Sequence, residues 1–279
     1  MSISAADVKA LRDRTNAPMM ECKAALTEAG GNMETATDLL RKKMKNIQVS
    51  RGGRETAEGR VAVYVDEGKK VGAIVEMRCE SAPVAKADHF KDLANEVAKQ
   101  VALQNPASVD ALLALTLPDG KTINDRIADV IGMIRENMKV QRFTRLTGLL
   151  GAYSHHDGTL GVLVLVEGTQ GDPQVLRDVC MHIAARNPVS AVKEDVPAAV
   201  IEKEKEIARD QLANDPKNKG KPANIVEKIL EGKMKTWFAE NVLVEQPFVK
   251  DDSKTVGQLL AQHGLKMVKF VRYKVGEVS

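Results

Sequence analysis

Along the first forty residues, apolar positions recur with the three- or four-residue spacing of helices packed by one face. They fall in three segments, Val8–Leu11, Cys22–Ala29 and Met33–Leu40. Ser4 and Asp7 have the spacing of a capping box, in which each side chain bonds an unpaired helix amide. Pro18 suits the first turn of a second helix, Gly30-Gly31 would end it, and Asn32 can cap the third. The pattern predicts three short helices.

From Arg60 the spacing of apolar residues changes, and short strands and helices are mixed in small groups. Val61, Val63 and Val65 alternate with other residues, as a half-buried strand requires, and a second strand follows the Glu67-Gly68 turn. The further expected segments are a strand over Val71–Cys79, helices over Ala87–Leu103 and Ile123–Asn137, strands over Val140–Leu150 and Leu160–Val166, and a helix over Asp172–Arg186. The regular alternation of a doubly wound sheet is missing, so the sequence predicts an α+β fold.

Between Pro197 and Asn241 the sequence is highly charged and helical on both sides of a tip rich in turn formers. The tip holds Asn214, Asp215, Pro216, Asn218, Gly220 and Pro222. Apolar positions mark the two arms, with Ile201, Ala208 and Leu212 on the first and Ile225, Ile229, Leu230, Met234 and Trp237 on the second. Two helices joined in this way predict an inserted antiparallel hairpin, a coiled coil. A helix over Thr255–His263 and a strand over Lys266–Val275 complete the chain.

These segments predict a division of the chain into domains. The three N-terminal helices, with their small apolar faces, resemble the ubiquitin-associated (UBA-like) fold. The expected parts are a UBA-like module at 1–45, a basic linker at 46–58, a core N-terminal subdomain at 59–146, a core C-terminal subdomain at 147–190 and 242–279, and the inserted hairpin at 191–241. The stretch Arg41–Arg54 holds six basic and no acidic residues, which favours a flexible linker. An electrostatic contact with an acidic partner or with RNA is the alternative.

Composition narrows the class of protein. The 279 residues carry 41 basic and 38 acidic side chains, a net charge of +3, whereas a dedicated DNA-binding protein usually has a clearer basic excess. No apolar run approaches the roughly 20 residues that a membrane span needs. Targeting signals are not recognisable, and Cys22, Cys79 and Cys180 lie too far apart for a zinc knuckle. We therefore expect a cytoplasmic protein whose partners include neither DNA nor a membrane.

Motifs for catalysis and for nucleotide binding are absent from the sequence. It contains neither a phosphate-binding loop nor a dinucleotide-binding glycine pattern, and no Ser or Cys stands in a nucleophile motif. His155 and His156 are adjacent, so on a strand they would face opposite ways, and a surface pair is favoured over a metal site. His182 lies among apolar residues and is predicted to be a core or interface histidine rather than a base. We expect no enzyme activity, metal or other cofactor.

Several segments together closely resemble the elongation factor Ts family. The N-terminal signature is Leu11-Arg12-Asp13-Arg14-Thr15 followed by Met19-Met20-Glu21-Cys22-Lys23-Ala24-Ala25-Leu26. Further matches follow in the same order at Thr56–Gly59, Cys79–Lys86, Met181–Ala185, Glu231–Met234, Gln246–Phe248 and Lys254–Leu260. The resemblance implies a guanine-nucleotide exchange factor that binds elongation factor Tu and promotes GDP release by distorting the sites that hold magnesium and phosphates.

The resemblance also implies which residues touch this GTPase. The matching positions are Arg12, Met19, Met20, Lys23, Ser81, Ala82, Pro83, Val84, Ile134 and His155. For Met19 and Met20 the alternative role is packing inside the helical module. Cys22 and Leu26 already fill the inward stripe, so at least one of the two methionines is expected to be exposed.

In three places the sequence departs from the family pattern. Where the family has Thr-Asp-Phe-Val, with Asp and Phe wedged beside the magnesium site, this chain has Ser81-Ala82-Pro83-Val84. Either exchange depends more on the N-terminal helices and the His155 region, or the partner GTPase has changed to match. Pro18 replaces a residue that is usually small, which a helix start tolerates. The chain stops at Ser279, with no room for the terminal helix of longer members, so contacts of that helix are not expected.

Two other functions compete with exchange. The altered motif would suit a diverged paralogue that binds elongation factor Tu without efficient exchange. A UBA-like interaction adaptor or RNA-associated protein would need only residues 1–54, although aromatic residues, the usual base-stacking platform, make up only 3% of the chain. The sequence leaves open whether the chain forms a homodimer or a 2:2 complex with the GTPase.

Overall fold

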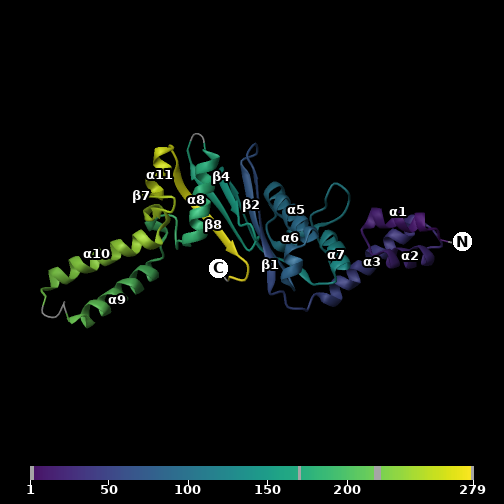
Figure 1. Ribbon diagram of the computed structural model, residues 1–279, viewed down its shortest axis with the longest axis horizontal. Helices are drawn as coiled ribbons and strands as arrows, with labels where there is room; N and C mark the ends of the chain where they lie inside the picture. The colour runs from purple at the N-terminus through teal and green to yellow at the C-terminus, as the bar shows by residue number, and fades with distance from the viewer. Residues whose placement is uncertain (1–2, 169–170, 217–220, 278–279) are drawn as a thin grey trace. The chain divides into compact units, whose positions relative to one another are not determined.

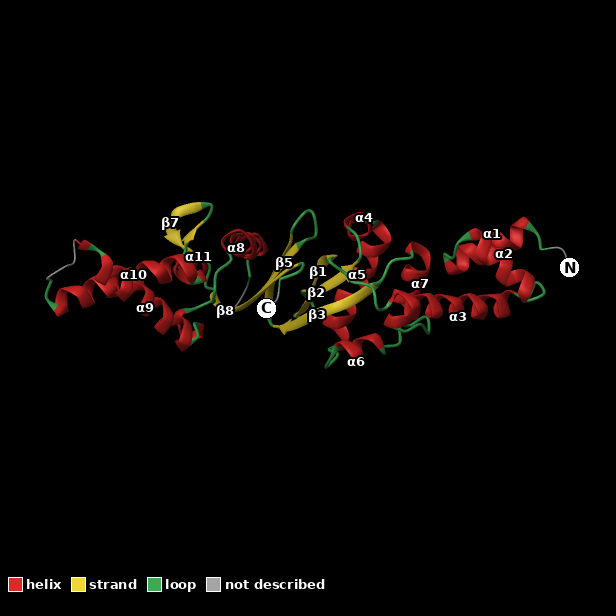
Figure 2. Cartoon of the chain, turned by 90° about the horizontal axis from the view of Figure 1, so that it is seen from below, coloured by secondary structure: helices red, strands yellow, loops and turns green. Residues whose placement is uncertain are grey.

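The computed structural model describes residues 3–168, 171–216 and 221–277, and the chain divides into two compact units. The first unit comprises Met1–Leu146, Ser154–Gly161 and Tyr273–Ser279. The second comprises Thr147–Tyr153 and Val162–Arg272. Both contain helices and small β-sheets (Figures 1 and 2). The first unit therefore takes in segments from both ends of the sequence.

The first unit begins with the three expected helices, α1 (Ala5–Thr15), α2 (Met19–Glu28) and α3 (Met33–Arg51). The Ser4–Asp7 capping box is present at α1, and the Asn32 side chain accepts from two amides of the first turn of α3. Their small core includes the fully buried Leu11, Cys22 and Leu26. The apolar spacing thus predicted this three-helix module correctly.

Helix α3 is longer than expected and enters the range 46–58 that was expected to be a basic linker. Residues 46–51 are helical, so the expectation of a linker is wrong for them. No helix-breaking residue precedes Gly52-Gly53, and Ile47 packs against both the core of the module and the core of the sheet region. Tertiary packing on one face therefore keeps this basic segment helical.

Helix α3 docks on α7 (Ile123–Ile134). A Cβ atom added to Gly132 of α7 would lie 1.8 Å from Sδ of Met44, so any larger residue would require the Met44 side chain to move. Lys45 Nζ pairs with Asp125 at 2.9 Å, and the amide nitrogen of the Gln48 side chain donates to Asn124 at 2.8 Å. Burial raises the pKa of Asp125, but bonds from Lys45 and Thr122 outweigh it and hold the pKa at about 2. The module is thus fixed to its own unit by packing and by charge.

A three-stranded sheet forms the centre of the first unit, with the strand order β1-β2-β3. Its strands are β1 (Glu58–Asp66), β2 (Val71–Cys79) and β3 (Met138–Thr147). Strands β1 and β2 are antiparallel, in a register that pairs Glu58 with Cys79 and Asp66 with Val71. The accompanying helices are α4 (Ala82–Lys86), α5 (Asp88–Gln104) and α6 (Val109–Leu113). Helix α5 packs on β1 and β2 through fully buried side chains such as Phe90 and Val97.

One buried carboxylate joins two strands of this sheet to the end of the chain. Glu76 on β2 is fully buried and pairs with Arg78 Nη1 at 3.0 Å and Arg142 Nε at 2.7 Å. The backbone N–H of Gly276 donates to the same carboxylate at 3.1 Å, and the Arg142 guanidinium lies 4.2 Å from the centroid of the Tyr273 ring. We call these five residues the Glu76 cluster. It fixes the returning C-terminal segment to the first unit.

In the second unit, a sheet has the strand order β4-β5-β8. Its strands are β4 (Leu149–Ser154), β5 (Leu160–Glu167) and β8 (Lys266–Lys274), and α8 (Pro173–Arg186) follows β5 in the chain. The single strand expected over Val140–Leu150 is wrong, because it is two strands that belong to different sheets. Gly148 separates them with φ 135°, a conformation that favours glycine.

Two long helices, α9 (Ala198–Asn214) and α10 (Ala223–Asn241), lie side by side in the second unit (Figure 1). Ala208, Leu212 and Leu230 form the buried contact between them. Ile225, expected on the apolar face of the second arm, is 39% exposed. Part of the expected tip, including Asn218 and Gly220, lies outside the described residues. The remaining elements are η1 (Lys193–Asp195), η3 (Leu243–Glu245), β6 (Pro247–Phe248), β7 (Asp251–Thr255) and α11 (Val256–Gln262).

His182 on α8 is a core histidine, as the sequence predicted. The ring is fully buried, and Nδ1 accepts a hydrogen bond from the Val249 N–H at 3.1 Å. Nε2 therefore carries the proton and donates to Oε1 of Gln246 at 2.8 Å. Burial lowers the pKa of His182 below the ordinary value of an imidazole, because desolvation disfavours the charged ring and outweighs the opposing effect of the bond to Gln246.

Acid is therefore expected to weaken the second unit through His182. The unfolded chain takes up a proton on this ring near pH 6.5, whereas the folded chain does so only at a lower pH. The stability is complete above about pH 6.5 and falls below it, by up to about 1.4 kcal/mol per pH unit. Melting temperatures between pH 5 and 8 should fall more steeply for the wild type than for His182→Gln. The exposed His89 supplies the control His89→Gln, and parallel curves for wild type and His182→Gln would contradict the prediction.

Candidate functional site

The described residues contain no arrangement typical of a catalytic centre. Within them, no group of three or more His, Cys, Asp and Glu side chains is placed to hold a metal ion. Cys22, Cys79 and Cys180 are buried and unpaired, and burial raises the pKa of Cys79 to about 12, so this thiol stays protonated and unreactive. None of the helices in the described part of the chain has the length and apolar character to cross a bilayer.

The first candidate surface is the start of α2. Met19 and Met20 are 51% and 74% exposed, so both methionines, rather than only one, lie outside the core. Cys22 and Leu26 are fully buried on the inward face of this helix. Met19 lies at the exposed N-terminal end of that face, and Met20 points away from it. Lys23 is exposed on the same helix. Two adaptable apolar side chains beside a cation form a surface suited to binding another protein.

Arg12, the fourth predicted contact residue of the module, lies on α1. Its side chain is exposed, and its carbonyl oxygen accepts from the N–H of Asn16, which ends α1 in a left-handed conformation. A guanidinium at this position is available for directional hydrogen bonds to a partner.

The second candidate surface is the turn of residues 81–84, between β2 and α4. Ser81 is the residue before the first turn of α4, and Ala82 and Pro83 begin the helix and are exposed. Val84 is half-buried and packs against the core of the sheet region. The two positions where the family motif carries Asp and Phe thus point away from the core, with short side chains.

Two consecutive residues that the sequence did not single out connect these surfaces. Arg135 is ion-paired with Glu21, which follows Met20 on α2. Glu136 accepts from both the hydroxyl and the N–H of Ser81, at 2.6 and 3.0 Å. Both partners are far away in sequence, so no local spacing could have indicated the contacts.

Ile134 ends α7 immediately before this pair. It is half-buried and packs against the core of the sheet region, so its environment is more that of a supporting residue than of a freely exposed one. The structure therefore brings together the start of α2, the end of α7 and the 81–84 turn.

His155 lies elsewhere in the first unit, in the turn between β4 and β5. Its ring lies 4.4 Å from the ring of His156, and its N–H donates to Leu160. The Val61 N–H of β1 donates to Gly158 of the same turn at 2.8 Å. Burial raises the pKa of Asp157, but bonds from Thr159 and the nearby imidazoles outweigh it, so the pKa is lowered. The turn that carries His155 is thus bonded to β1.

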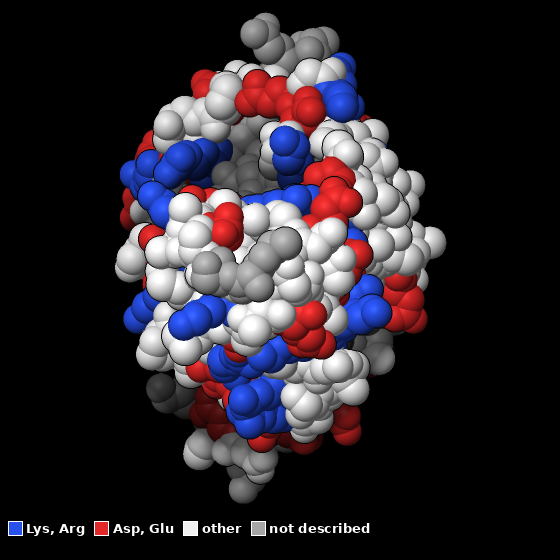
Figure 3. Space-filling model, turned by 90° about the vertical axis from the view of Figure 1, so that its right-hand side faces the viewer, with Lys and Arg blue, Asp and Glu red and all other residues white. Residues whose placement is uncertain are grey.

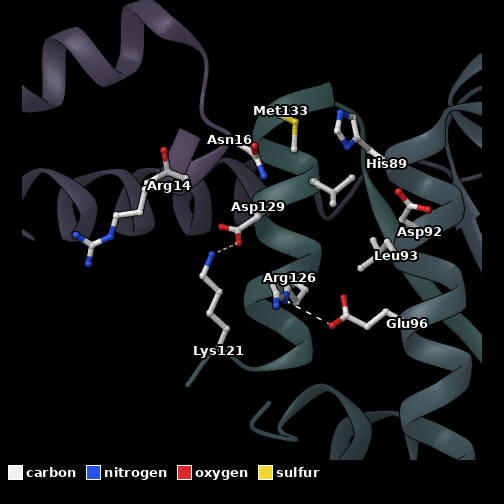
Figure 4. A pocket seen from close by; sticks show the side chains of 12 residues that line it. Arg14, Asn16, His89, Asp92, Leu93, Glu96, Lys121, Arg126, Asp129 and Met133 are labelled. Carbon is white, nitrogen blue, oxygen red and sulfur yellow. Dashed lines mark hydrogen bonds and ion pairs between the residues drawn. The ribbon is translucent and has the colours of Figure 1, made fainter. Parts of the chain in front are cut away.

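A polar cleft of about 200 Å³ lies between the end of α1, α5 and α7 (Figure 4). Its charged side chains largely pair with one another: Lys121 Nζ is 2.6 Å from Asp129, and Arg126 Nε is 3.7 Å from Glu96. Figure 3 likewise shows basic and acidic side chains mixed over the face that it presents. Neither the cleft nor this face offers an extended field of one sign.

The exposed methionines, the cation beside them and the turn bonded to Glu136 have the chemistry of a surface suited to binding another protein. The family model described as elongation factor TS matches residues 83–277. Elongation factor Ts of Thioalkalivibrio sulfidiphilus (strain HL-EbGR7) is 45% identical over 281 residues, which cover 99% of this chain and 93% of the relative. The elongation factor Ts proteins of Methylococcus capsulatus and Halothermothrix orenii are 45% and 40% identical, over the same shares of the two chains. This chain belongs to the elongation factor Ts family.

Proposed function

We propose that this chain is a guanine-nucleotide exchange factor that binds elongation factor Tu in its GDP-bound form and promotes GDP release during translation elongation. One observation carries the proposal beyond family membership. Arg135 and Glu136 connect three segments that are expected to touch the GTPase and that belong to one unit. These segments are the start of α2, the end of α7 and the 81–84 turn. An exchange factor needs such a preformed surface, because its binding energy must be spent on distorting its partner.

The energetics of this function are modest. A thousandfold faster release of GDP requires about 4 kcal/mol off the barrier. Two methionines that become buried on binding, together with a few charged contacts, are of a size to supply it. Thermodynamic linkage requires that GDP weaken the binding of the factor as much as the factor weakens the binding of GDP. The chain needs no catalytic side chain or cofactor for this role, and we propose that it is not an enzyme.

The test is stopped-flow release of fluorescent GDP from the elongation factor Tu of the same organism, with and without this protein. Acceleration by about a hundredfold, close to 3 kcal/mol, supports the proposal. Stable binding without acceleration would refute it and would favour the diverged paralogue. That second candidate is supported by Ala82 and Pro83, which lack the carboxylate and the ring of the family motif.

The methionine surface gives a direct prediction. Replacing Met19 and Met20 together with alanine should raise the Kd for elongation factor Tu tenfold or more, since two buried apolar anchors are worth about 1.5–3 kcal/mol each. Folding should be unaffected, because both side chains are at least half exposed. Titration calorimetry measures the affinity. Val49, 81% exposed on α3 and outside the expected contact, gives the control Val49→Ala. Equal losses for both variants would argue against a specific contact.

Finer assignments belong to the same proposal. We assign the three-helix module to the UBA-like class and the α9–α10 pair to an antiparallel coiled coil, and we keep the five expected domains with 46–51 moved into the helix. We expect the protein in the cytoplasm, acting on elongation factor Tu without DNA or a membrane, with a homodimer and a 2:2 complex as the two assemblies left open. The packing of Leu212 against Leu230 supports the coiled coil.

A further inference from the structure

The side chain of Ser81 forms a hydrogen bond that is unusual for the N-cap of a helix. It occupies the N-cap position of α4, where a serine side chain normally accepts from an amide of the first helical turn. Here it forms no such bond. Its hydroxyl instead donates to Oε1 of Glu136 at 2.6 Å, and its N–H donates to Oε2 at 3.0 Å. Both oxygens of one carboxylate are thus used to hold the residue that begins the 81–84 turn.

Glu136 is itself held on both sides. Arg135 has φ 68°, a left-handed conformation that ends α7 and turns the chain toward the sheet. The N–H of Asn137 donates to Oε1 of Glu80 at 2.6 Å, and its side-chain amide donates to the Arg54 carbonyl at 2.8 Å. The segment after α7 and the end of β2 are therefore joined by charge-assisted bonds in both directions.

Arg135 extends the connection to the helical module. Its guanidinium pairs with Glu21, whose side chain is 14% exposed, and Glu21 follows directly after the exposed Met19 and Met20. If a bound partner displaces α2, Glu21 moves and pulls on Arg135 through their ion pair. Because Arg135 and Glu136 are adjacent in the chain, the position of Glu136 and of Ser81 bonded to it would change as well.

We propose that Glu136 is a positioning residue for nucleotide exchange, and that Arg135 and Glu136 hold the 81–84 turn in register with the methionine surface of α2. This inference rests on the proposed exchange function. Ala82 and Pro83 have no long side chain that could adjust to the GTPase, so the placement of the turn must come from the backbone and its anchor. An error of about 1 Å in the placement of an acting group can cost a hundredfold in rate.

The two anchors are expected to affect different kinetic quantities. Glu136→Gln places an amide N–H2 group against a donor of Ser81, so it should lower the maximal rate of GDP release at saturating factor about tenfold. The concentration for half-maximal release should change less than about twofold. Arg135→Met removes the ion pair between α2 and the end of α7, while α2 stays packed on α1 and α3, and it should mainly raise that concentration. A merely structural role of Glu136 would not separate the two quantities.

Ser81→Ala provides the second variant. It removes only the hydroxyl that donates to Glu136, and we expect the fold to be kept because Ser81 is not a core residue. If Ser81 acts through Glu136, the double variant should be no slower than Glu136→Gln alone. Amide hydrogen exchange over α4 should also be faster in both single variants. Glu67→Gln, an exposed glutamate in the turn between β1 and β2, is the matched control and should equal the wild type.

The outcomes separate the two claims. A wild-type protein that fails to accelerate GDP release overturns the proposed function. An active wild type together with a Glu136→Gln variant of equal maximal rate overturns the positioning role alone. Additive losses for Ser81→Ala and Glu136→Gln also overturn it, because the two residues would then act independently.

Discussion

Replacing Glu76 with alanine should lower the free energy of unfolding of the first unit by about 3–5 kcal/mol. The fully buried carboxylate is the shared partner of Arg78 and Arg142. Their side chains are only 15% and 18% exposed, so water cannot replace the lost partner without disturbing the packing. The Gly276 N–H would lose its acceptor as well. Urea unfolding followed by circular dichroism measures the loss, and amide hydrogen exchange over β1 and β2 locates it.

The exposed Glu55 gives the matched control, and Glu55→Ala should be within about 0.5 kcal/mol of the wild type. Glu76→Gln should lie between the two, since an amide oxygen still accepts one bond but carries no charge. A loss below about 1 kcal/mol for Glu76→Ala would mean that the bonds from Arg78 and Arg142 to backbone carbonyls are enough to hold them, and that the cluster has little effect on stability.

The double substitution Ala82→Asp/Pro83→Phe should speed GDP release from a generic elongation factor Tu about tenfold, equivalent to roughly 1.4 kcal/mol off the barrier. Both positions are exposed, so the new carboxylate and ring need no space in the core. The anchor at Ser81 is unchanged, and it would present these groups where the family motif has them. Stopped-flow release at saturating factor measures the gain.

Ala82→Asn/Pro83→Ala is the control, because it removes the proline without adding charge or a ring. A gain with the generic partner and none with the partner from the same organism would indicate that the cognate GTPase has changed to match. No gain with the generic partner would contradict the idea that the missing carboxylate and ring limit exchange, and would leave the α2 surface and the His155 region as the source of activity.

Helices and strands were predictable from the sequence wherever the regular spacing of apolar residues continued over enough positions to be recognised. The strand Val71–Cys79 has the bounds expected from its apolar run, and α8 ends at Arg186, before Pro188, as expected. Helices α4 and α6 were missed, because five residues are too few to show a helical period. The break at Gly148 was missed for another reason: apolar residues continue on both sides of it, and only the switch from one sheet to the other requires the left-handed glycine.

The candidate site was predictable to a different extent. Exposure of at least one of Met19 and Met20 was predictable, because Cys22 and Leu26 already filled the inward face of α2, and the structure exposes both. The roles of Arg135 and Glu136 did not follow, since their partners lie 114 and 55 residues away. Charged residues at the end of a helix are ordinary, and only the folded chain shows which carboxylate faces which serine.

The Glu76 cluster sets an order of events during synthesis. A ribosome releases β2 long before Gly276, which lies 200 residues further along the chain than Glu76. Until then, the nascent first unit has a buried carboxylate without its last hydrogen-bond donor, and Arg142 without the ring of Tyr273. The strands β1, β2 and β3 thus precede by far the residues that complete their shared ion-pair cluster, so the first unit is complete only once Gly276 has been synthesised.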